Sequence, residues 1–248
     1  MVWYLNVSWD DVHHLNEKAK ADLIASYPSH ELETRTKGVP MMGEGAVFPL
    51  DDEEISCEPF EVPRHFPRIN GVDFGIDHPF ACAFNAWDRD SDTWYVYDCY
   101  RTSGQTPVYH AAAIKKYGNW IPVAWPHDGM ARDKGSGKML KDQYREHGVA
   151  MLNRSSRYDE EKGGGQPVEP IVLEMYERMR TGRLKVFKNL SYWFQEKRMY
   201  HRKDGKIQPV RDDLLKATMY AMMDKRRASV YHAPVTKRPR YTGPIVGS

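Results

Sequence analysis

The run INGVDFG (69–75) is followed in the sequence by two more apolar runs, ACAFNAW (81–87) and WYVYDCY (94–100). Each run is short, and polar or glycine-containing segments separate the three, a pattern typical of consecutive β-strands. The polar segment DRDSDT (88–93) is short enough to join its two neighbours as a hairpin. These residues therefore predict a sheet that begins with three antiparallel strands.

Helical and strand patterns alternate after these runs. Thr106 as N-cap, Pro107 in the first turn and Gly118 beyond the end predict one helix, and WIPVAWP (120–126) predicts the next strand. Asp204-Gly205 favours a two-residue hairpin. The same reasoning predicts helices from Ser136 to Gly148, from Pro170 to Gly182, over 192–197 and from Asp212 to Lys225, and short strands at 149–152 and 184–187. We therefore expect an α/β fold with a mixed sheet, three antiparallel strands followed by parallel strands, flanked by α-helices and carrying an auxiliary β-hairpin.

The composition is that of a folded protein with an uneven charge distribution. The chain has 248 residues, 41% hydrophobic and 28% charged, and no stretch reaches the ~18 consecutive apolar residues that a membrane-spanning helix needs. Residues 1–62 hold 13 acidic and 4 basic residues, whereas residues 63–248 hold 21 acidic and 32 basic residues. A basic body is expected of a protein that binds phosphate, although a solvated charged surface gives the same count.

Acidic residues stand at the ends of three predicted elements. Asp73 interrupts the first apolar strand, Asp128 follows the fourth strand beside His127, and Asp212 and Asp213 open the last helix. Each position also has a structural explanation, as an Asp at a strand end, a turn-forming Asp-Gly pair, or acids that cap a helix and oppose its dipole. If the fold brings these carboxylates together, their oxygens form the ligand set that Mg²⁺ or Mn²⁺ prefers.

Competing catalytic motifs do not occur in the sequence. There is no HExxH, no paired CxxC, no GxSxG and no GxGxxG. GSGK (135–138) is incomplete as a Walker A motif, because Arg132 stands where the motif needs glycine and Met139 where it needs serine or threonine. We therefore expect no ATPase activity from this chain.

Four motifs together resemble the nuclease domain of the large terminase subunit of tailed double-stranded DNA bacteriophages. They are VDFG (72–75), WPHDG (125–129), YHRKDGKI (200–207) and DDLLKATMYAMM (212–223). The resemblance covers residues 68–227 in the expected order and implies an RNase H-like, retroviral integrase-like fold. It also implies a metal-dependent endonuclease that cuts concatemeric double-stranded DNA during viral genome packaging, by a two-metal-ion mechanism with little sequence specificity.

The resemblance assigns roles to individual acids. Asp73 would bridge two divalent ions, Mg²⁺ or Mn²⁺, Asp128 would bind one of them, and Asp213, in preference to Asp212, would be the third ligand. Two further residues are candidate auxiliary groups, Asp77 and His127. Lys216 stands where some relatives carry another acid, which leaves the second metal position open.

The resemblance also predicts the organisation and the partners of the chain. Residues 1–67 resemble the connection from an ATPase domain, residues 68–227 form the nuclease domain, and residues 228–248 are expected to be a basic, flexible tail. The implied partners are double-stranded DNA, the terminase ATPase domain, the small terminase subunit and the portal protein, in the cytoplasm of the host cell. The expected DNA-binding residues are Lys134, Lys138, Arg202, Lys203, Lys206, Arg226 and Arg227.

Two alternatives remain open at this point. A junction resolvase would have the same RNase H-like fold but a different DNA substrate. A non-catalytic module that docks a packaging motor on DNA or on the portal would use the same acids only as caps and turn formers.

Overall fold

A mixed six-stranded sheet forms the centre of the computed structural model, which describes residues 18, 20, 21, 24, 45–75, 78–132, 137–157, 168–203 and 206–232. The strands are β1 (Ser56–Cys57), β2 (Arg68–Asp73), β3 (Phe80–Asp88), β4 (Thr93–Thr102), β5 (Val123–Ala124) and β6 (Leu184–Phe187). Their order is β1-β6-β4-β3-β2-β5. β2, β3 and β4 pair antiparallel, whereas β5 joins β2, β6 joins β4 and β1 joins β6 in parallel. The predicted mixed sheet, with three antiparallel strands and further parallel strands, is thus confirmed.

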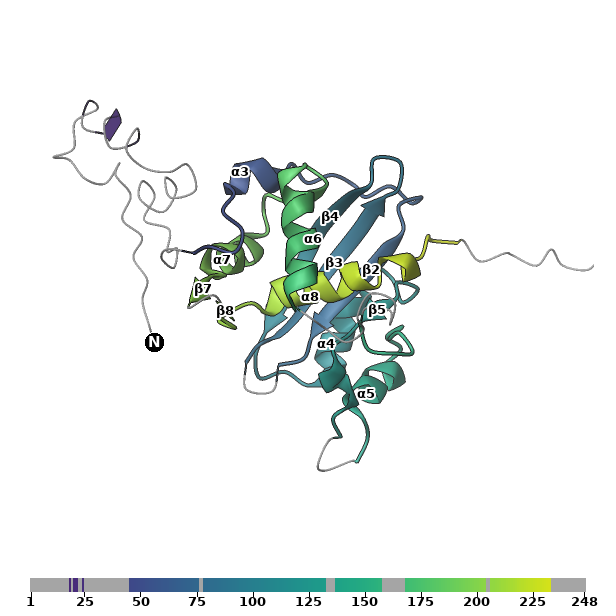
Figure 1. Ribbon diagram of the computed structural model, residues 1–248. Coiled ribbons are helices and arrows are strands. Elements are labelled where there is room, and N and C mark those ends of the chain that lie inside the picture. Colours follow the sequence, from purple (N-terminus) through teal and green to yellow (C-terminus); the bar gives the residue numbers. More distant parts are fainter. Residues whose placement is uncertain are drawn as a thin grey trace, which may run out of the picture.

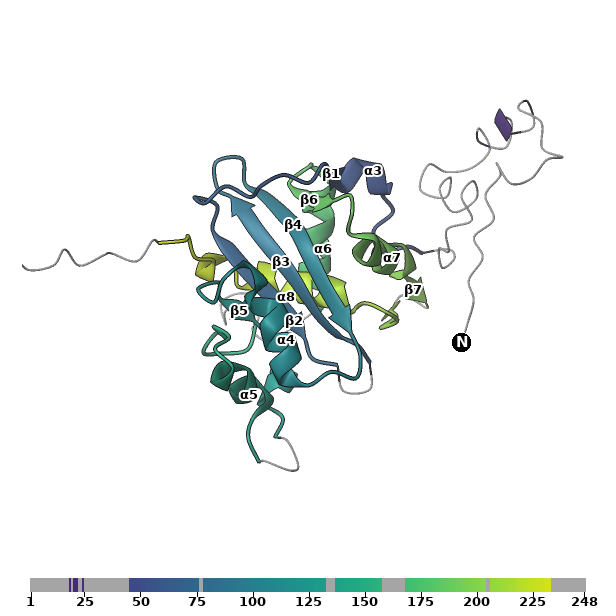
Figure 2. The ribbon, with the colours of Figure 1, turned by 180° about the vertical axis from the view of Figure 1, so that it is seen from behind.

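Helices cover both faces of this sheet. They are α3 (Asp52–Ile55), α4 (Pro107–Ile114), α5 (Leu140–Glu146), α6 (Val168–Arg180), α7 (Ser191–Met199) and α8 (Asp213–Met223), with short 3₁₀ turns η2 (Lys115–Tyr117), η3 (His127–Met130) and η5 (Lys225–Arg227). Figure 1 shows α6 and α8 in front of the sheet, and Figure 2 shows α4 on the opposite face with α5 beside it. The predicted auxiliary hairpin is present as β7 (Arg202–Lys203) and β8 (Lys206–Ile207), which pair antiparallel.

Three predicted elements differ in the structure. The strand expected at 120–126 shortens to β5, because Pro122 and Pro126 bracket it and cannot donate to a ladder. The strand expected at 149–152 is a single bridge between Val123 and Met151. The helix expected to start at Ser136 has Met139 as its N-cap, and Ser136 itself lies outside the described residues.

The sheet extends beyond the expected limits of the nuclease domain. Residues Ser56 and Cys57 of β1 lie within the segment 1–67 that resembles a linker, yet they pair with Val186 and Phe187 at the edge of the sheet. At the other end of the chain, Ser229 bridges to Arg68. The described residues of both flanking segments therefore add to the domain, while the boundaries at 67 and 228 remain predictions.

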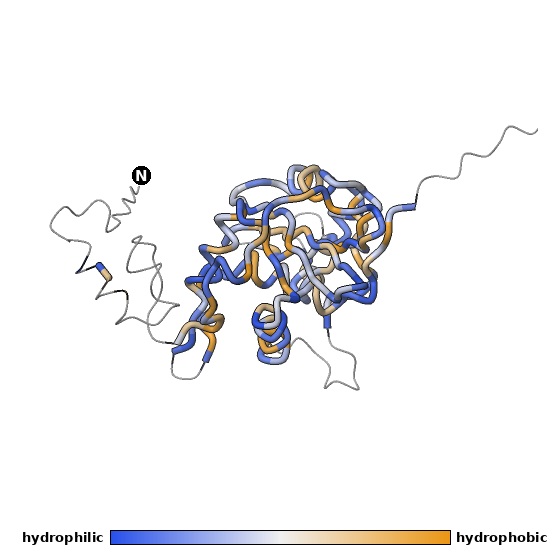
Figure 3. Tube along the Cα trace, turned by 90° about the horizontal axis from the view of Figure 1, so that it is seen from above, coloured by the Kyte–Doolittle hydropathy of each residue, from blue (hydrophilic) through white to orange (hydrophobic). Residues whose placement is uncertain are grey.

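The core is built on the buried strands and on three fully buried tryptophans with satisfied N–H groups. Trp94 Nε1 donates to Asn85, Trp125 Nε1 donates to the Leu152 carbonyl, and Trp193 Nε1 donates to Thr218, at 2.8–3.1 Å. In Figure 3, hydrophilic stretches lie mainly in the outer loops and hydrophobic stretches run through the body. Among the described residues, no helix has the length and apolar character needed to cross a membrane.

Helix α8 lies directly on β2 because residue 71 is a glycine. A Cβ atom built on Gly71 would stand 1.8 Å from the Ala217 carbonyl oxygen of α8 and 3.1 Å from the Ala221 nitrogen. Any side chain at position 71 would therefore push α8 off the sheet. This close approach fixes the distance between the end of β2 and the beginning of α8.

Gly71→Ala is expected to destabilise the domain by about 3 kcal/mol or more, because the clash is with backbone atoms in the core and cannot be relieved by a rotamer change. Gly182→Ala is the matched control, since it has open space around it and only a positive φ of 71°, and it should cost about 1 kcal/mol. Urea unfolding measures both. Equal losses of stability in the two variants would contradict the close-approach interpretation.

Candidate active site

Asp73 is the last residue of β2, at the end of the strand against which α8 lies. Its side chain is buried, and Oδ2 has no hydrogen-bond partner among the described residues. The pKa of Asp73 is raised to about 7, mainly by burial and also by the negative charges of Asp213 and Asp212, while the charges of Lys216 and His78 act in the opposite direction. A buried carboxylate in this state lacks a compensating cation.

Asp128 reaches the same edge of the sheet through β5. β5 is parallel to β2, with Gly71 opposite Ala124, so both strands end on the same side. Asp128 and His127 follow in η3, and both are exposed. Asp128 follows the strand at 123–124, as predicted, and the structure adds that this strand lies parallel beside β2.

The N-terminus of α8 brings two more carboxylates to this edge. Asp212 is the N-cap residue by position and Asp213 is the first helical residue, and both are buried. Asp212 Oδ1 lies 3.1 Å from Lys216 Nζ, one turn later in the helix. Burial lowers the pKa of Lys216, but the charges of Asp212 and Asp73 outweigh it and the net shift is upward. Lys216 therefore stays protonated and offsets part of the negative charge.

Tyr220 shows which of these carboxylates share one environment. It lies on α8 two turns after Asp213, and its pKa is raised mainly by burial and then by the charges of Asp73, Asp128 and Asp212. Asp73 of β2, Asp128 of η3 and Asp212 before α8 therefore all lie near enough to Tyr220 to affect its pKa, while their role as a metal site stays a prediction.

Three residues of the site were not identified from the sequence. Arg101 on β4 and His78 before β3 both contact Asp213, at 3.1 Å and 3.2 Å. Glu196 on α7 is 2% exposed, and burial together with the charge of Asp213 raises its pKa to about 8. Nothing in the local pattern marks Glu196, because an acid in an amphipathic helix is ordinary; only the tertiary packing of α7 on α8 reveals it.

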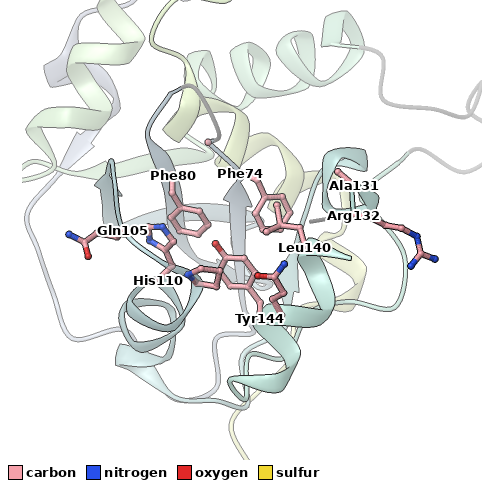
Figure 4. A pocket seen from close by; sticks show the side chains of 11 residues that line it. Phe74, Phe80, Gln105, His110, Ala131, Arg132, Leu140 and Tyr144 are labelled. Carbon is pink, nitrogen blue, oxygen red and sulfur yellow. The ribbon is translucent and has the colours of Figure 1, made fainter. Parts of the chain in front are cut away.

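A pocket of about 300 Å³ adjoins this site. It lies between the residues that follow Asp73, namely Phe74 and Gly75, and those that follow η3, Ala131 and Arg132. Figure 4 shows His110 and Tyr144 in its apolar wall, with the Gln105 and Arg132 side chains at opposite sides. Phe80 stacks on His110 with ring centroids 4.0 Å apart. The pocket therefore separates the loops that carry Asp73 and Asp128 from α4 and α5.

The donor chemistry of the site fits a hard divalent cation. The acids offer carboxylate oxygens, and the unpartnered Oδ2 of Asp73 is the atom that a cation would satisfy. Within the described part of the chain, no three His, Cys, Asp or Glu side chains are arranged to hold a metal ion. Asp77, the predicted auxiliary ligand, lies outside the described residues. The oxygen donors are thus present near Asp73, but they do not form a closed ligand set.

The described DNA-binding candidates lie in three places in the structure: the β7–β8 hairpin, the segment before α5, and η5. Lys203 and Lys206 are exposed on the β7–β8 hairpin, which precedes α8, and Arg202 beside them pairs with Glu169 at 2.7 Å. Lys138 lies before α5 and pairs with Glu146 at 2.7 Å, while Lys134 lies outside the described residues.

Arg226 and Arg227 belong to η5, after the C-terminal end of α8, where Arg227 pairs with Asp224. Since Ser229 bridges to Arg68 at the start of β2, this end of α8 lies about 15 Å or more from Asp73. The structure thus places these two arginines away from the acidic cluster.

Comparison with known proteins identifies relatives of this chain. The sequence profile of a family described as terminase RNaseH-like domain matches residues 70–225. The large terminase subunit of Salmonella phage P22 is 42% identical over 225 residues, which cover 90% of this chain and 44% of that protein. The large subunit of Enterobacteria phage LP7 is also 42% identical, over 90% of this chain and 46% of that protein. The chain therefore spans less than half the length of these relatives.

Solved structures give the same picture. The P22 large terminase nuclease domain superposes with a TM-score of 0.69 at 41% identity, covering 76% of this chain and 96% of that domain. The large terminase of a thermophilic bacteriophage superposes with a TM-score of 0.56 at 15% identity, covering 91% of this chain and 56% of that protein. The second likeness shows a shared fold.

The raised pKa of Asp73 predicts a pH-dependent stability of the metal-free protein. Between the ordinary pKa of 3.8 and the folded value of about 7, the folded protein holds a proton that the unfolded chain has released. The stabilising contribution of this proton is complete below about pH 4 and is lost as the pH rises through 7. Asp73→Asn should therefore match the wild type near pH 4 and exceed its free energy of unfolding by about 1 kcal/mol or more at pH 8, in urea unfolding with EDTA.

Asp142→Asn is the control, because Asp142 lies on α5 with a side chain 42% exposed. It should change stability little and without this pH trend. A constant difference between Asp73→Asn and the wild type from pH 4 to 8 would show that Asp73 does not titrate in this range.

Proposed function

Because this chain belongs to the terminase RNaseH-like domain family, the nuclease domain of large terminase subunits, we propose that it is a metal-dependent endonuclease for concatemeric double-stranded DNA. The reaction is hydrolysis of phosphodiester bonds during viral genome packaging. The observation that carries the proposal is the convergence of Asp73, Asp128 and the Asp212-Asp213 pair at one edge of the sheet, with a buried Asp73 oxygen that has no described partner.

Asp73, Asp128 and Asp213 would hold the metal ions, with Asp212 beside them and Asp77 as an auxiliary group. Carboxylate oxygens suit Mg²⁺ and Mn²⁺. When two such ions are bound, they supply a Lewis acid that activates water and stabilises the leaving oxygen.

The remaining side chains prepare the site for an anionic substrate. Ionisation of the buried Asp73 is unfavourable in the absence of a cation, as its pKa of about 7 indicates. A bound cation would favour the ionised carboxylate and lower this pKa. Lys216 and Arg101 place positive charge between the acids, which reduces the repulsion that a phosphate would meet. Tyr220 stands among the acids with a pKa above its ordinary value, so its hydroxyl stays protonated and can donate a hydrogen bond.

DNA binding is proposed to use phosphate contacts, since cutting packaged DNA of any sequence needs no base readout. Lys203 and Lys206 on the hairpin are exposed and lie in the sequence just before α8. Lys134, Lys138, Arg202, Arg226 and Arg227 complete the proposed basic set. The proposed partners are the terminase ATPase domain, the small terminase subunit and the portal protein, in the cytoplasm of the host cell.

The purified chain is expected to nick and linearise supercoiled plasmid with Mn²⁺ or Mg²⁺ and to be inactive in EDTA. Asp73→Asn, Asp128→Asn and Asp213→Asn should each lower the rate by a factor of roughly 100 or more, because each removes a charged metal ligand. Asp142→Asn on α5 is the matched control and should keep the wild-type rate.

The outcome also separates the alternatives. Cleavage that persists in all three folded variants would refute this site. A wild-type protein that binds DNA but never cleaves it would favour a docking module, and cleavage confined to branched DNA would favour a junction resolvase.

Removing the Lys203 and Lys206 side chains together should weaken DNA binding, and the factor of weakening should be the same for DNA molecules of unrelated sequence. The slope of log K against log salt should become shallower by up to about 2, because each lysine neutralises about one phosphate. A matched double variant at Lys185 and Lys188, which contact Glu54 and Glu58, removes the same charge elsewhere and should leave the slope unchanged. Filter binding or fluorescence anisotropy at several salt concentrations measures both, and equal slopes in the two double variants would exclude the hairpin from the DNA interface.

A further inference from the structure

Arg101 joins β4 to the beginning of α8. Its Nη2 and Nε atoms donate to Oδ2 of Asp213 at 3.1 Å and 3.2 Å. Nε also lies 3.1 Å from Oε1 of Glu196 on α7, as an ion pair whose angle falls outside hydrogen-bond geometry. One guanidinium therefore contacts two carboxylates from two helices.

Glu196 in turn holds the backbone from which Asp213 projects. Its Oε2 accepts hydrogen bonds from the backbone N–H groups of Leu214 and Leu215, at 2.6 Å and 3.3 Å. The side chain of Asp212, the N-cap residue, makes no capping hydrogen bond. Glu196 thus supplies from a neighbouring helix the cap that α8 lacks in its own sequence.

The arrangement is costly if its only purpose is stability. Glu196 and Asp213 are 2% and 4% exposed, and burying two carboxylates around one arginine costs desolvation that apolar side chains of similar volume would avoid. The two helices are also held by other contacts: Trp193 of α7 donates to Thr218 of α8 at 3.0 Å. α7 is therefore attached to α8 by contacts other than this polar network.

We propose that Arg101 and Glu196 are positioning residues that set the orientation of the Asp213 carboxylate for metal binding. The proposal rests on the metal-dependent nuclease function proposed above. Arg101 fixes Oδ2, while the partner of Oδ1 is His78, whose side chain is 53% exposed. Oδ1 of Asp213 is therefore the oxygen that can exchange its partner, His78, for a cation. Glu196 holds the Arg101 guanidinium and also the backbone N–H groups of Leu214 and Leu215, which follow Asp213.

Glu196→Gln separates positioning from helix capping. The glutamine oxygen can still accept from Leu214 and Leu215, but its NH2 group then takes the place of Oε1 and sets donors against the Arg101 guanidinium. The melting temperature should stay within a few degrees of the wild type, while the Mn²⁺ dissociation constant measured by calorimetry and the Mn²⁺ concentration for half-maximal plasmid cleavage should both rise about tenfold. Arg101→Lys keeps the positive charge but loses the guanidinium whose Nε and Nη2 both donate to Asp213, and it should have the same effect.

Arg178→Met is the matched control. Arg178 is a buried arginine of α6 that pairs with Asp92, beyond the β3–β4 turn at the end of the sheet opposite Asp73. It should lower the melting temperature without changing the Mn²⁺ dependence. The double variant of Glu196→Gln and Arg101→Lys should lose little more than either single variant, because both act through Asp213.

Wild-type Mn²⁺ dependence in folded Glu196→Gln and Arg101→Lys proteins would overturn the proposal. The calorimetric measurement of Mn²⁺ binding tests the positioning proposal independently of DNA cleavage. If the wild type binds Mn²⁺ through Asp213 but does not cleave DNA, the nuclease proposal fails, and the positioning proposal is still tested by Mn²⁺ binding. Absence of Asp213-dependent Mn²⁺ binding in the wild type would overturn both.

Discussion

The contact of α8 with β2 at Gly71 is the constraint on which the site depends. Because the α8 backbone lies directly against this strand, the end of β2 and the first turn of α8 are held at one edge of the sheet, each with a buried acid. β5 is bound to β2 in parallel register and delivers Asp128 to the same edge. The acidic cluster is therefore a product of backbone packing, and the side chains that complete it, Arg101 and Glu196, come from elements packed around the same crossing.

The acidic residues at the two ends of the sheet differ in how far nearby cations compensate their charge. At the end away from Asp73, Asp92 pairs with two arginines, Arg178 and Arg183. Burial opposes a lower pKa of Asp92, but hydrogen bonds from Trp87 and Arg178 and the charges of Arg178 and Lys225 lower it. At the end that carries Asp73, carboxylates outnumber the cations among them, and the pKa values of Asp73 and Glu196 are raised. The cluster around Asp92 is compensated by its own arginines, whereas the cluster around Asp73 keeps excess negative charge, which is the charge balance that the proposed cation site needs.

Much of the fold could be predicted from the sequence because the residues that start and end its helices and strands act on their immediate neighbours. The antiparallel runs of β2, β3 and β4, Pro107 at the start of α4 and the Asp-Gly hairpin depend on neighbouring residues, and each is present. The acids Asp73, Asp128 and Asp213 could be proposed as site residues because each stands at or next to the end or the start of a predicted element. Glu196 and Arg101 could not, since their roles arise from the packing of α7 and β4 against α8. β1 was missed because two residues at the edge of a sheet carry no periodic pattern.

Helix α7 connects two regions through adjacent residues. Glu196 faces α8, while the next two residues, Lys197 and Arg198, bind Asp52 at the start of α3, and Lys197 also binds the Leu50 carbonyl. The chain that enters the domain before residue 52 is thus tied to the same helix that caps α8. The segment around Leu50 and Asp52 and the first turn of α8 are therefore held by successive residues of one helix, so the entry of the chain into the domain and the backbone beneath Asp213 share a single support.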